Sequence, residues 1–449
     1  MSFQRYKDYK DSGIEWVDKL PSCWKLAKLR WLATLYSGGT PDKEKLFFWE
    51  NGTIPWLSSG AVNERIIDRP STYITKEAFE NSSAKWIPEG AIVMALAGQG
   101  KTKGMVARMA ISSTCNQSMA AIVPSSELYS SYLFWWLDSN YQNIRNMAGG
   151  DLRDGLNLEL LGNIPCPLPQ YAEQQSIAAF LDAETARIDS LIADYEALMA
   201  LLREERQAVI SHAVTKGLNP DVPMKDSGIE WLGEVPEHWG KATLKQLVAG
   251  IESGVSVNAT DISAEPGEIA VLKTSCVYGG HFSINENKTV APHDISRVSC
   301  PIRAGTLIVS RMNTPKLVGE SGLVRESRDH IYLPDRLWQV HFKEISTEYV
   351  YFWSRTQSYR IQVEMACDGA SSSMQSFSKE DYLSFMLPLP PFPEQQAIAA
   401  YLDAETARID SLITDAEKAI DLLRESRTAL ISDAVTGKID VRDWQQENA

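Results

Sequence analysis

The chain has 449 residues, of which 44% are hydrophobic, and it carries a net charge of −14 at neutral pH. This length suits two or more domains, each large enough to bury a core. No run of about 18 apolar residues occurs, which excludes a membrane-spanning helix, and the polar start MSFQRYKDYKDSG predicts no secretory signal. Six widely spaced cysteines without a CxxC pair favour reduced thiols in a cytoplasmic protein, and the scattered histidines predict no metal site.

The acidic charge is concentrated in two segments of the chain. Residues 173–213 carry eight acidic and three basic side chains, and residues 394–435 carry nine and four. By contrast, residues 1–172 have 18 basic and 17 acidic side chains, and residues 214–393 have 17 and 21. The net charge therefore does not exclude nucleic-acid binding by the regions outside the two acidic segments.

Taken in chain order, the sequence repeats itself twice. The motif DSGIEWVDKLPSCW at residues 11–24 recurs as DSGIEWLGEVPEHW at 226–239. The segment 167–218 recurs at 388–439, with 34 of 52 positions identical. The repeats predict two tandem halves related by a pseudo-twofold axis, each made of a variable block and a nearly duplicated segment.

The two variable blocks share a pattern of short strands, glycine-rich turns and one aromatic helix. Residues 54–59 parallel 269–274, residues 90–95 parallel 305–310, and the cluster LFWW at 133–136 parallels VYFW at 350–353. The aromatic cluster could offer a base-stacking platform, but its helical spacing favours a packed core helix. We therefore predict an α+β protein with two mixed α/β domains in tandem, divided as 1–165 (first block), 166–218 (central helix), 219–387 (second block) and 388–449 (C-terminal helix and tail).

The duplicated segments predict two long helices. Neither glycine nor proline occurs between residues 173 and 213, and apolar residues recur about every 3.5 positions, as in a left-handed coiled coil. We expect the helices, each about 60 Å long, to pair antiparallel and to space the two blocks. Apolar residues beside the seam favour docking of additional partner helices. The predicted seam and partner-binding residues are Ile177, Leu181, Ile188, Leu191, Leu198, Leu202, Ile398, Leu402, Ile409, Leu412, Leu423 and Leu430.

This combination of motifs resembles the specificity subunits of type I restriction-modification systems. The resemblance rests on the junctions PLP…EQQ (167–175) and PLPP…EQQ (388–396), and on GIEW followed by PxxW at 13–24 and 228–239. The first block also contains Gly39-Thr40-Pro41, whereas the second has Gly254-Val255-Ser256 and lacks the proline.

The resemblance implies a division of labour between this chain and partner subunits. Each block would be a target-recognition domain that reads one half of a split, asymmetric double-stranded DNA sequence. The long helices would dock two modification subunits that methylate adenine with S-adenosylmethionine, and restriction subunits using ATP and Mg could join them. The chain itself would contain no cofactor and catalyse no reaction.

Residues 95–102, ALAGQGKT, fit a relaxed P-loop pattern after an apolar run. A working P-loop opens a helix whose N-terminal amides face phosphate, but here Gly104 and a second strand-like run follow. We expect a strand-connecting loop whose polar side chains approach DNA.

The predicted DNA contacts lie in loops that carry side chains able to pair with base edges or phosphates. They are Ser58, Ser59, Gln99, Lys101, Thr102, Lys103, Arg153, Lys273, Thr274, Arg311, Asn313, Lys316, Ser372 and Gln375.

The sequence shows no methyltransferase quartet, glycine-rich cofactor loop or recognisable catalytic constellation. Two alternatives remain: a coiled-coil scaffold that binds only proteins, and a P-loop NTPase. The strongly divergent blocks beside nearly identical helices favour recognition, because a scaffold needs no variable blocks.

Overall fold

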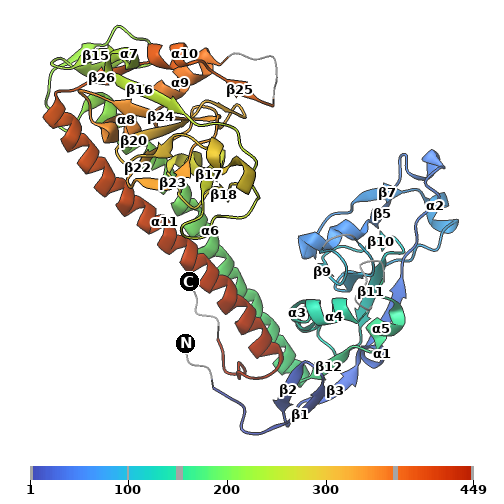
Figure 1. Cartoon of the computed structure of the whole chain (residues 1–449). Coiled ribbons are helices and arrows are strands. Elements are labelled where there is room, and N and C mark those ends of the chain that lie inside the picture. Colours follow the sequence, from blue (N-terminus) through green and yellow to red (C-terminus); the bar gives the residue numbers. More distant parts are fainter. Residues whose placement is uncertain (1–3, 99–100, 148–154, 368–372, 446–449) are drawn as a thin grey trace. The chain divides into compact units, whose positions relative to one another are not determined.

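The computed structural model describes residues 4–98, 101–147, 155–367 and 373–445 (Figure 1). The chain forms two compact units, Met1–Tyr195 with Lys418–Ala449, and Glu196–Glu417. Both divisions fall inside the long helices α6 (Tyr171–Lys216) and α11 (Phe392–Val435). Each unit therefore contains one block and a segment of both helices.

The two blocks are built on central sheets that share four strands in the same order, and the first sheet has a fifth strand, β6, beside β9. The first is ordered β4-β11-β8-β9-β6 and the second β16-β24-β20-β22. All neighbours pair antiparallel except β6 and β9. The first sheet comprises β4 (Ala33–Ser37), β6 (Ile66–Ile67), β8 (Ile92–Ala95), β9 (Val106–Met109) and β11 (Met119–Pro124). The second comprises β16 (Val248–Ser253), β20 (Thr306–Ser310), β22 (Ser321–Val324) and β24 (Leu337–Phe342).

Each central sheet is buried on both faces, because alternate residues of a strand point to opposite sides. In β8, Ile92 and Met94 join the core that contains the aromatic helix, whereas Val93 and Ala95 join a second core. In β20, Leu307 and Ile308 divide in the same way. This arrangement explains why these strands read as continuous apolar runs.

A smaller sheet packs beside each central sheet. In each block, this smaller sheet contains one pair of parallel neighbouring strands. In the first block the order is β10-β5-β7, and in the second it is β18-β17-β23-β19. The strands are β5 (Ile54–Leu57), β7 (Thr72–Ile74), β10 (Thr114–Cys115), β17 (Ala270–Leu272), β18 (Asn287–Thr289), β19 (Pro301–Ile302) and β23 (Arg328–Tyr332). The predicted correspondence of 54–59 with 269–274 is confirmed, because β5 and β17 each pair parallel with a later strand.

Short helices complete the blocks, and the predicted aromatic core helix is confirmed. Leu133, Phe134, Trp135 and Trp136 on α3 are at most 3% exposed, so they cannot stack on bases. The helices are α1 (Leu29–Leu32), α2 (Lys76–Glu80), α3 (Ser130–Ser139), α4 (Tyr141–Asn146), α5 (Leu158–Gly162), α7 (Leu244–Leu247), α8 (Thr347–Trp353), α9 (Gln357–Ala366) and α10 (Lys379–Ser384).

Each block begins with a hairpin and ends with a strand that leads into a long helix. The strand carrying the PLP sequence pairs antiparallel with a strand that follows the repeated hairpin motif. The hairpin strands are β1 (Tyr9–Ile14), β2 (Val17–Pro21), β13 (Met224–Asp226) and β14 (Glu234–Pro236). The later pairs are β3 (Lys25–Lys28) with β12 (Pro165–Leu168), and β15 (Gly240–Thr243) with β26 (Met386–Leu389).

The long helices pair antiparallel within each unit, as predicted. In the second unit, Arg206 binds Asp410 through two hydrogen bonds of 3.0 and 3.4 Å, while Arg203 lies 3.8 Å from Glu417. Arg203 precedes Arg206 on α6, whereas its partner Glu417 follows Asp410 on α11, so the two helices run in opposite directions. In the first unit, Arg427 binds Asp189 through contacts of 2.8 and 3.2 Å.

The buried seam departs from strict 3.5-residue spacing in its middle. Leu198 and Leu412, both predicted seam residues, are 44% and 41% exposed, whereas Ile420, outside the predicted seam, is 4% exposed. A straight helix turns every 3.6 residues, so a strict heptad stripe rotates away from its partner by about 20° per heptad. The remaining predicted seam residues are buried or half-buried: Ile177, Leu181, Ile188, Leu191, Leu202, Ile398, Leu402, Ile409, Leu423 and Leu430. Among the helices of the described residues, none combines the length and apolar composition of a membrane span.

Candidate nucleic-acid interface

The repeated PLP…EQQ junctions join each block to its long helix through a buried glutamine. Gln174 accepts a hydrogen bond of 2.7 Å from the Tyr129 N–H at the start of α3, and its amide donates to the carbonyl of Pro169. Gln395 accepts from the Ser346 N–H at 2.9 Å and donates to Pro390. Both glutamines are at most 1% exposed, so the same polar anchor fixes each long helix to its aromatic helix.

The glutamate of the same motif anchors the N-terminal hairpin in the first unit. Glu173 is 8% exposed and accepts hydrogen bonds from Tyr6 (2.6 Å) and from the Trp24 indole (3.0 Å). Burial and the hydrogen bond to Glu173 raise the pKa of Tyr6, so this hydroxyl stays protonated and donates. Tyr9 donates to the carbonyl of Gly437 after α11, so both ends of the chain contribute to the first unit. In the second unit the equivalent Glu394 binds His238 at 2.8 Å.

In the first block, the described part of the loop that contains Lys101 packs against α4 and lies beside Leu156. The loop between β8 and β9 lies against α4, where Tyr141 donates to the Lys101 carbonyl and Arg145 to the Lys103 carbonyl. The N–H of Leu156 donates to the carbonyl of Leu96 at 2.8 Å. The segment that follows residues 148–154 therefore lies beside the loop that contains Lys101.

In the second block, a short pair of strands joins two segments that were predicted to contact DNA. β21 (Met312–Asn313) pairs antiparallel with β25 (Gln375–Ser376), and Asn313 lies opposite Gln375. Tyr278 connects a third predicted segment to them. Its hydroxyl lies 3.2 Å from the Thr274 hydroxyl and accepts from the Asn313 amide at 3.0 Å. We call Thr274, Tyr278, Asn313 and Gln375 the second-block loop cluster.

Most of the predicted DNA contacts that the structure describes lie at or near the surface. Lys101 and Lys316 are exposed, whereas Lys273 lies 3.6 Å from Asp261, and Arg311 donates to the Asp335 carbonyl at 2.8 Å. The exposed or half-buried predicted contacts are Ser58, Ser59, Lys101, Thr102, Lys273, Thr274, Arg311, Lys316 and Gln375. Gln99, Arg153 and Ser372 lie outside the described residues.

Two of the predicted DNA contacts are buried. Lys103 is 4% exposed and Asn313 is 7% exposed. The Asn313 amide donates to Tyr278 and to Ser310, and its oxygen accepts from the Thr314 N–H. Because these bonds satisfy its polar atoms, Asn313 holds the second-block loop cluster in shape, and direct base contact would require the loop to rearrange.

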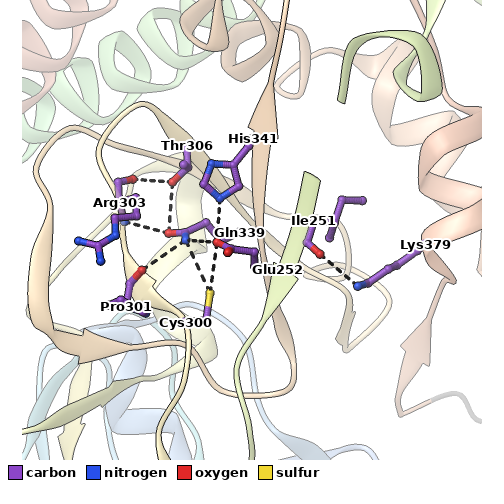
Figure 2. A network of polar contacts seen from close by, with 9 residues as sticks. All are labelled: Ile251, Glu252, Cys300, Pro301, Arg303, Thr306, Gln339, His341 and Lys379. Atoms are coloured by element: carbon purple, nitrogen blue, oxygen red, sulfur yellow. Dashed lines mark hydrogen bonds and ion pairs between the residues drawn. The ribbon is translucent and has the colours of Figure 1, made fainter. Parts of the chain in front are cut away.

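A second polar network joins the two sheets of the second block (Figure 2). Buried Gln339 on β24 donates to Glu252 on β16 at 2.9 Å and to the Pro301 carbonyl on β19 at 3.3 Å, and its oxygen accepts from the Arg303 N–H. His341 lies 2.8 Å from the same carboxylate, and this hydrogen bond lowers the pKa of Glu252. The network fixes the two sheets of the second block to each other.

The structure gives no support for the nucleotide-binding alternative. β8 and β9 pair antiparallel, so the relaxed P-loop sequence joins two strands and opens no helix. Within residues 4–98, 101–147, 155–367 and 373–445, no group of three or more histidine, cysteine, aspartate or glutamate side chains could hold a metal ion.

Comparison with known proteins shows which proteins the chain resembles. The model of the type I restriction modification DNA specificity domain matches residues 21–195. The EcoKI specificity subunit of Escherichia coli K12 is 24% identical across 96% of this chain and 92% of its own length. The MjaVIII specificity subunit of Methanocaldococcus jannaschii is 22% identical over 99% of this chain and 98% of its own. Along nearly its whole length, the chain is similar to specificity subunits of type I restriction enzymes.

Solved structures show the same fold along nearly the whole chain. A chain from a study of assembly and conformational transition in the type I R-M system gives a TM-score of 0.70 at 16% identity. The alignment covers 94% of this chain and 99% of that one. The HsdS subunit of Thermoanaerobacter tengcongensis gives 0.58 at 16% identity, over 94% and 98%. The predicted α+β fold with two blocks and two long helices is confirmed.

Our sequence reasoning missed polar residues that attach each block to its long helix. Asp182 binds Arg108 and Trp135 in the first unit, and Asp403 binds Arg325 in the second. A signal was present, because LDAETARIDSLI is identical in both repeats although a coiled-coil seam requires identity only at its apolar positions. Neither Tyr141 nor Tyr278 was predicted, and no pattern in the sequence indicated them.

Proposed function

We propose that this specificity subunit directs type I modification to a bipartite, asymmetric DNA target, with each block reading one half. The observation that supports this proposal is a shared framework with different loops. Both central sheets share four strands in the same order, yet the loop after β8 carries Lys101 and the loop after β20 carries Asn313 of the second-block loop cluster. A repeated frame with dissimilar loops suits the reading of two different sequences.

The partners follow from the family and from exposed apolar residues on the long helices. Leu198, Leu201, Leu412 and Leu422 are 41–66% exposed, which is the kind of surface that partner helices cover. We infer that two methyltransferase subunits dock there and use S-adenosylmethionine to methylate adenine. Restriction subunits would join through them with ATP and Mg, and this chain would itself catalyse nothing.

The proposal is tested with the chain purified together with its candidate methyltransferase. The complex, supplied with S-adenosylmethionine, should methylate adenine in one split motif from a random DNA pool, whereas the methyltransferase alone should not. Methylation that ignores sequence would support a protein-binding scaffold and overturn the recognition proposal.

Exchanging one block should change one half of the target. We expect replacement of residues 26–165 by the corresponding block of a relative with another target to alter the first half-motif. The second half-motif should stay intact, because the second block has its own sheets, cores and loop cluster. Methylation mapping of the chimera checks this result, and the reciprocal exchange of residues 240–385 is the matched control. A change in both half-motifs would show that the blocks do not read independently.

A further inference from the structure

The aspartate of the repeated LDAET sequence holds each block against its long helix. Asp182 and Asp403 occupy the same place in the two repeats. Each binds an arginine on or directly after the corresponding strand of the central sheet: Arg108 on β9 lies 3.0 Å from Asp182, and Arg325, directly after β22, lies 2.7 Å from Asp403. The same ion pair therefore joins block and helix in both units.

In the first unit this aspartate has a donor at each carboxylate oxygen. Arg108 binds Oδ2, and the Trp135 indole donates to Oδ1 at 3.0 Å. Arg108 also donates to Ser131 and lies over the Phe134 ring, 4.9 Å from its centroid. Its side chain is 22% exposed, so water and salt screen the ion pair incompletely. We call Arg108, Trp135 and Asp182 the first clamp.

In the second unit, Arg325 is the one donor to this aspartate among the residues that the structure describes. The aromatic helices correspond residue for residue, since Tyr132 donates to the Pro167 carbonyl and Tyr349 to that of Pro388. In this correspondence Phe352 replaces Trp135, so no indole N–H reaches Asp403. Arg325 is 62% exposed, and a cleft of about 400 Å³ lies beside Asp403, lined by Arg325 and Phe352 among others.

We propose that Asp182 and Asp403 are positioning residues that orient the two recognition blocks for DNA reading, with the first block held firmly and the second held by a weaker contact. The two carboxylates are about equally exposed, at 40% and 38%, so the difference lies in their partners. An exposed arginine as single partner contributes little and is screened by salt, whereas a mostly buried arginine together with an indole donor holds the carboxylate in place. The second half of the target is therefore read with less discrimination, and this discrimination falls as the salt concentration rises. This inference rests on the proposed function.

Replacing Asp182 and Asp403 by asparagine distinguishes a carboxylate with two donors from a carboxylate bound by arginine. An asparagine in place of Asp182 can accept at one oxygen only, so its NH2 group faces either Arg108 or Trp135. An asparagine in place of Asp403 can still accept from Arg325 and loses only charge. The full-length complex with its methyltransferase is assayed for the rate ratio between cognate DNA and DNA with one mismatch, in each half-motif and at two salt concentrations.

We expect Asp182→Asn to lower discrimination in the first half-motif about tenfold and to leave the second unchanged. Asp403→Asn should lower discrimination in the second half-motif about two- to threefold, and only at low salt. Phe352→Trp places an indole donor beside Asp403 where the cleft provides room, so it should raise discrimination in the second half-motif and remove its salt dependence. The control is Glu204→Gln, an exposed acidic residue of α6, and it should change neither ratio.

The outcomes distinguish failure of this inference from failure of the proposed function. If the wild-type complex methylates no split motif, the proposed function is wrong. If it does, but Asp182→Asn lowers discrimination equally in both half-motifs or in neither, the positioning role is wrong. Should that variant fail to fold, Phe352→Trp decides alone, and an unchanged salt dependence in the second half-motif overturns the inference.

Discussion

Replacing Gly254 with alanine is expected to destabilise the second block by about 3 kcal/mol or more, because the new methyl group overlaps backbone atoms. Gly254 follows β16, and an added Cβ would collide with the carbonyl oxygen and carbon of Leu333. Leu333 is 1% exposed and its N–H donates to the Cys300 carbonyl, so it has little freedom to move. Denaturant unfolding of the full chain with its methyltransferase partner, followed by hydrogen exchange, measures the loss.

The matched control is Gly250→Ala in β16, the strand that Gly254 follows. An alanine Cβ at Gly250 meets no atom within 4 Å, so this change should alter stability by about 0.5 kcal/mol or less. Hydrogen exchange should show faster opening of β16 and β24 for Gly254→Ala only. Equal effects of the two substitutions would show that the close approach at Leu333 is not what selects glycine.

Trp24→Ala is expected to cost the first unit about 3–5 kcal/mol. Trp24 is 1% exposed, its ring centroid lies 5.8 Å from that of Tyr6, and its indole donates to Glu173. Truncation leaves a cavity and removes one of the two hydrogen bonds that Glu173 accepts from Tyr6 and Trp24. Since Gly437 also lies against Trp24, residues 436–445 should become sensitive to protease, which limited proteolysis with mass spectrometry measures.

Trp31→Ala is the control for this second prediction. Trp31 is 76% exposed, so its removal should change stability by about 0.5 kcal/mol or less and leave the C-terminal segment protected. If both tryptophan variants unfolded at the same denaturant concentration, the packing around Trp24 would not be what holds the chain ends together.

Repetition made the framework predictable from the sequence. The correspondence of 90–95 with 305–310 and of 133–136 with 350–353 predicted the equivalent strands β8 and β20 and the equivalent helices α3 and α8. Absence of glycine and proline predicted the two long helices. These features depend on local pattern and on comparison of the chain with itself, so they required no knowledge of which segments meet.

The candidate site could be predicted only as a set of loops. Side-chain chemistry indicated the loops around Lys101, Arg311 and Gln375, and the structure brings Asn313 opposite Gln375. The sequence analysis predicted Asn313 as a DNA contact, and the structure shows that it is 7% exposed and bonded to Tyr278. The contact that Asn313 makes with Tyr278 joins residues 35 positions apart in the chain, and no local sequence pattern reveals such a contact.

The sequence by itself determined the tandem architecture, the two long helices and the family resemblance, because duplicated motifs and helical periodicity are properties of the chain order. Only the tertiary structure decided which donors each conserved aspartate of the repeat meets. Asp182 and Asp403 are identical in their repeats, yet the first meets an arginine and a tryptophan and the second an arginine alone. The physical reason is that the strength of a carboxylate contact depends on donors and solvent supplied by distant segments, and these come together only when the chain folds.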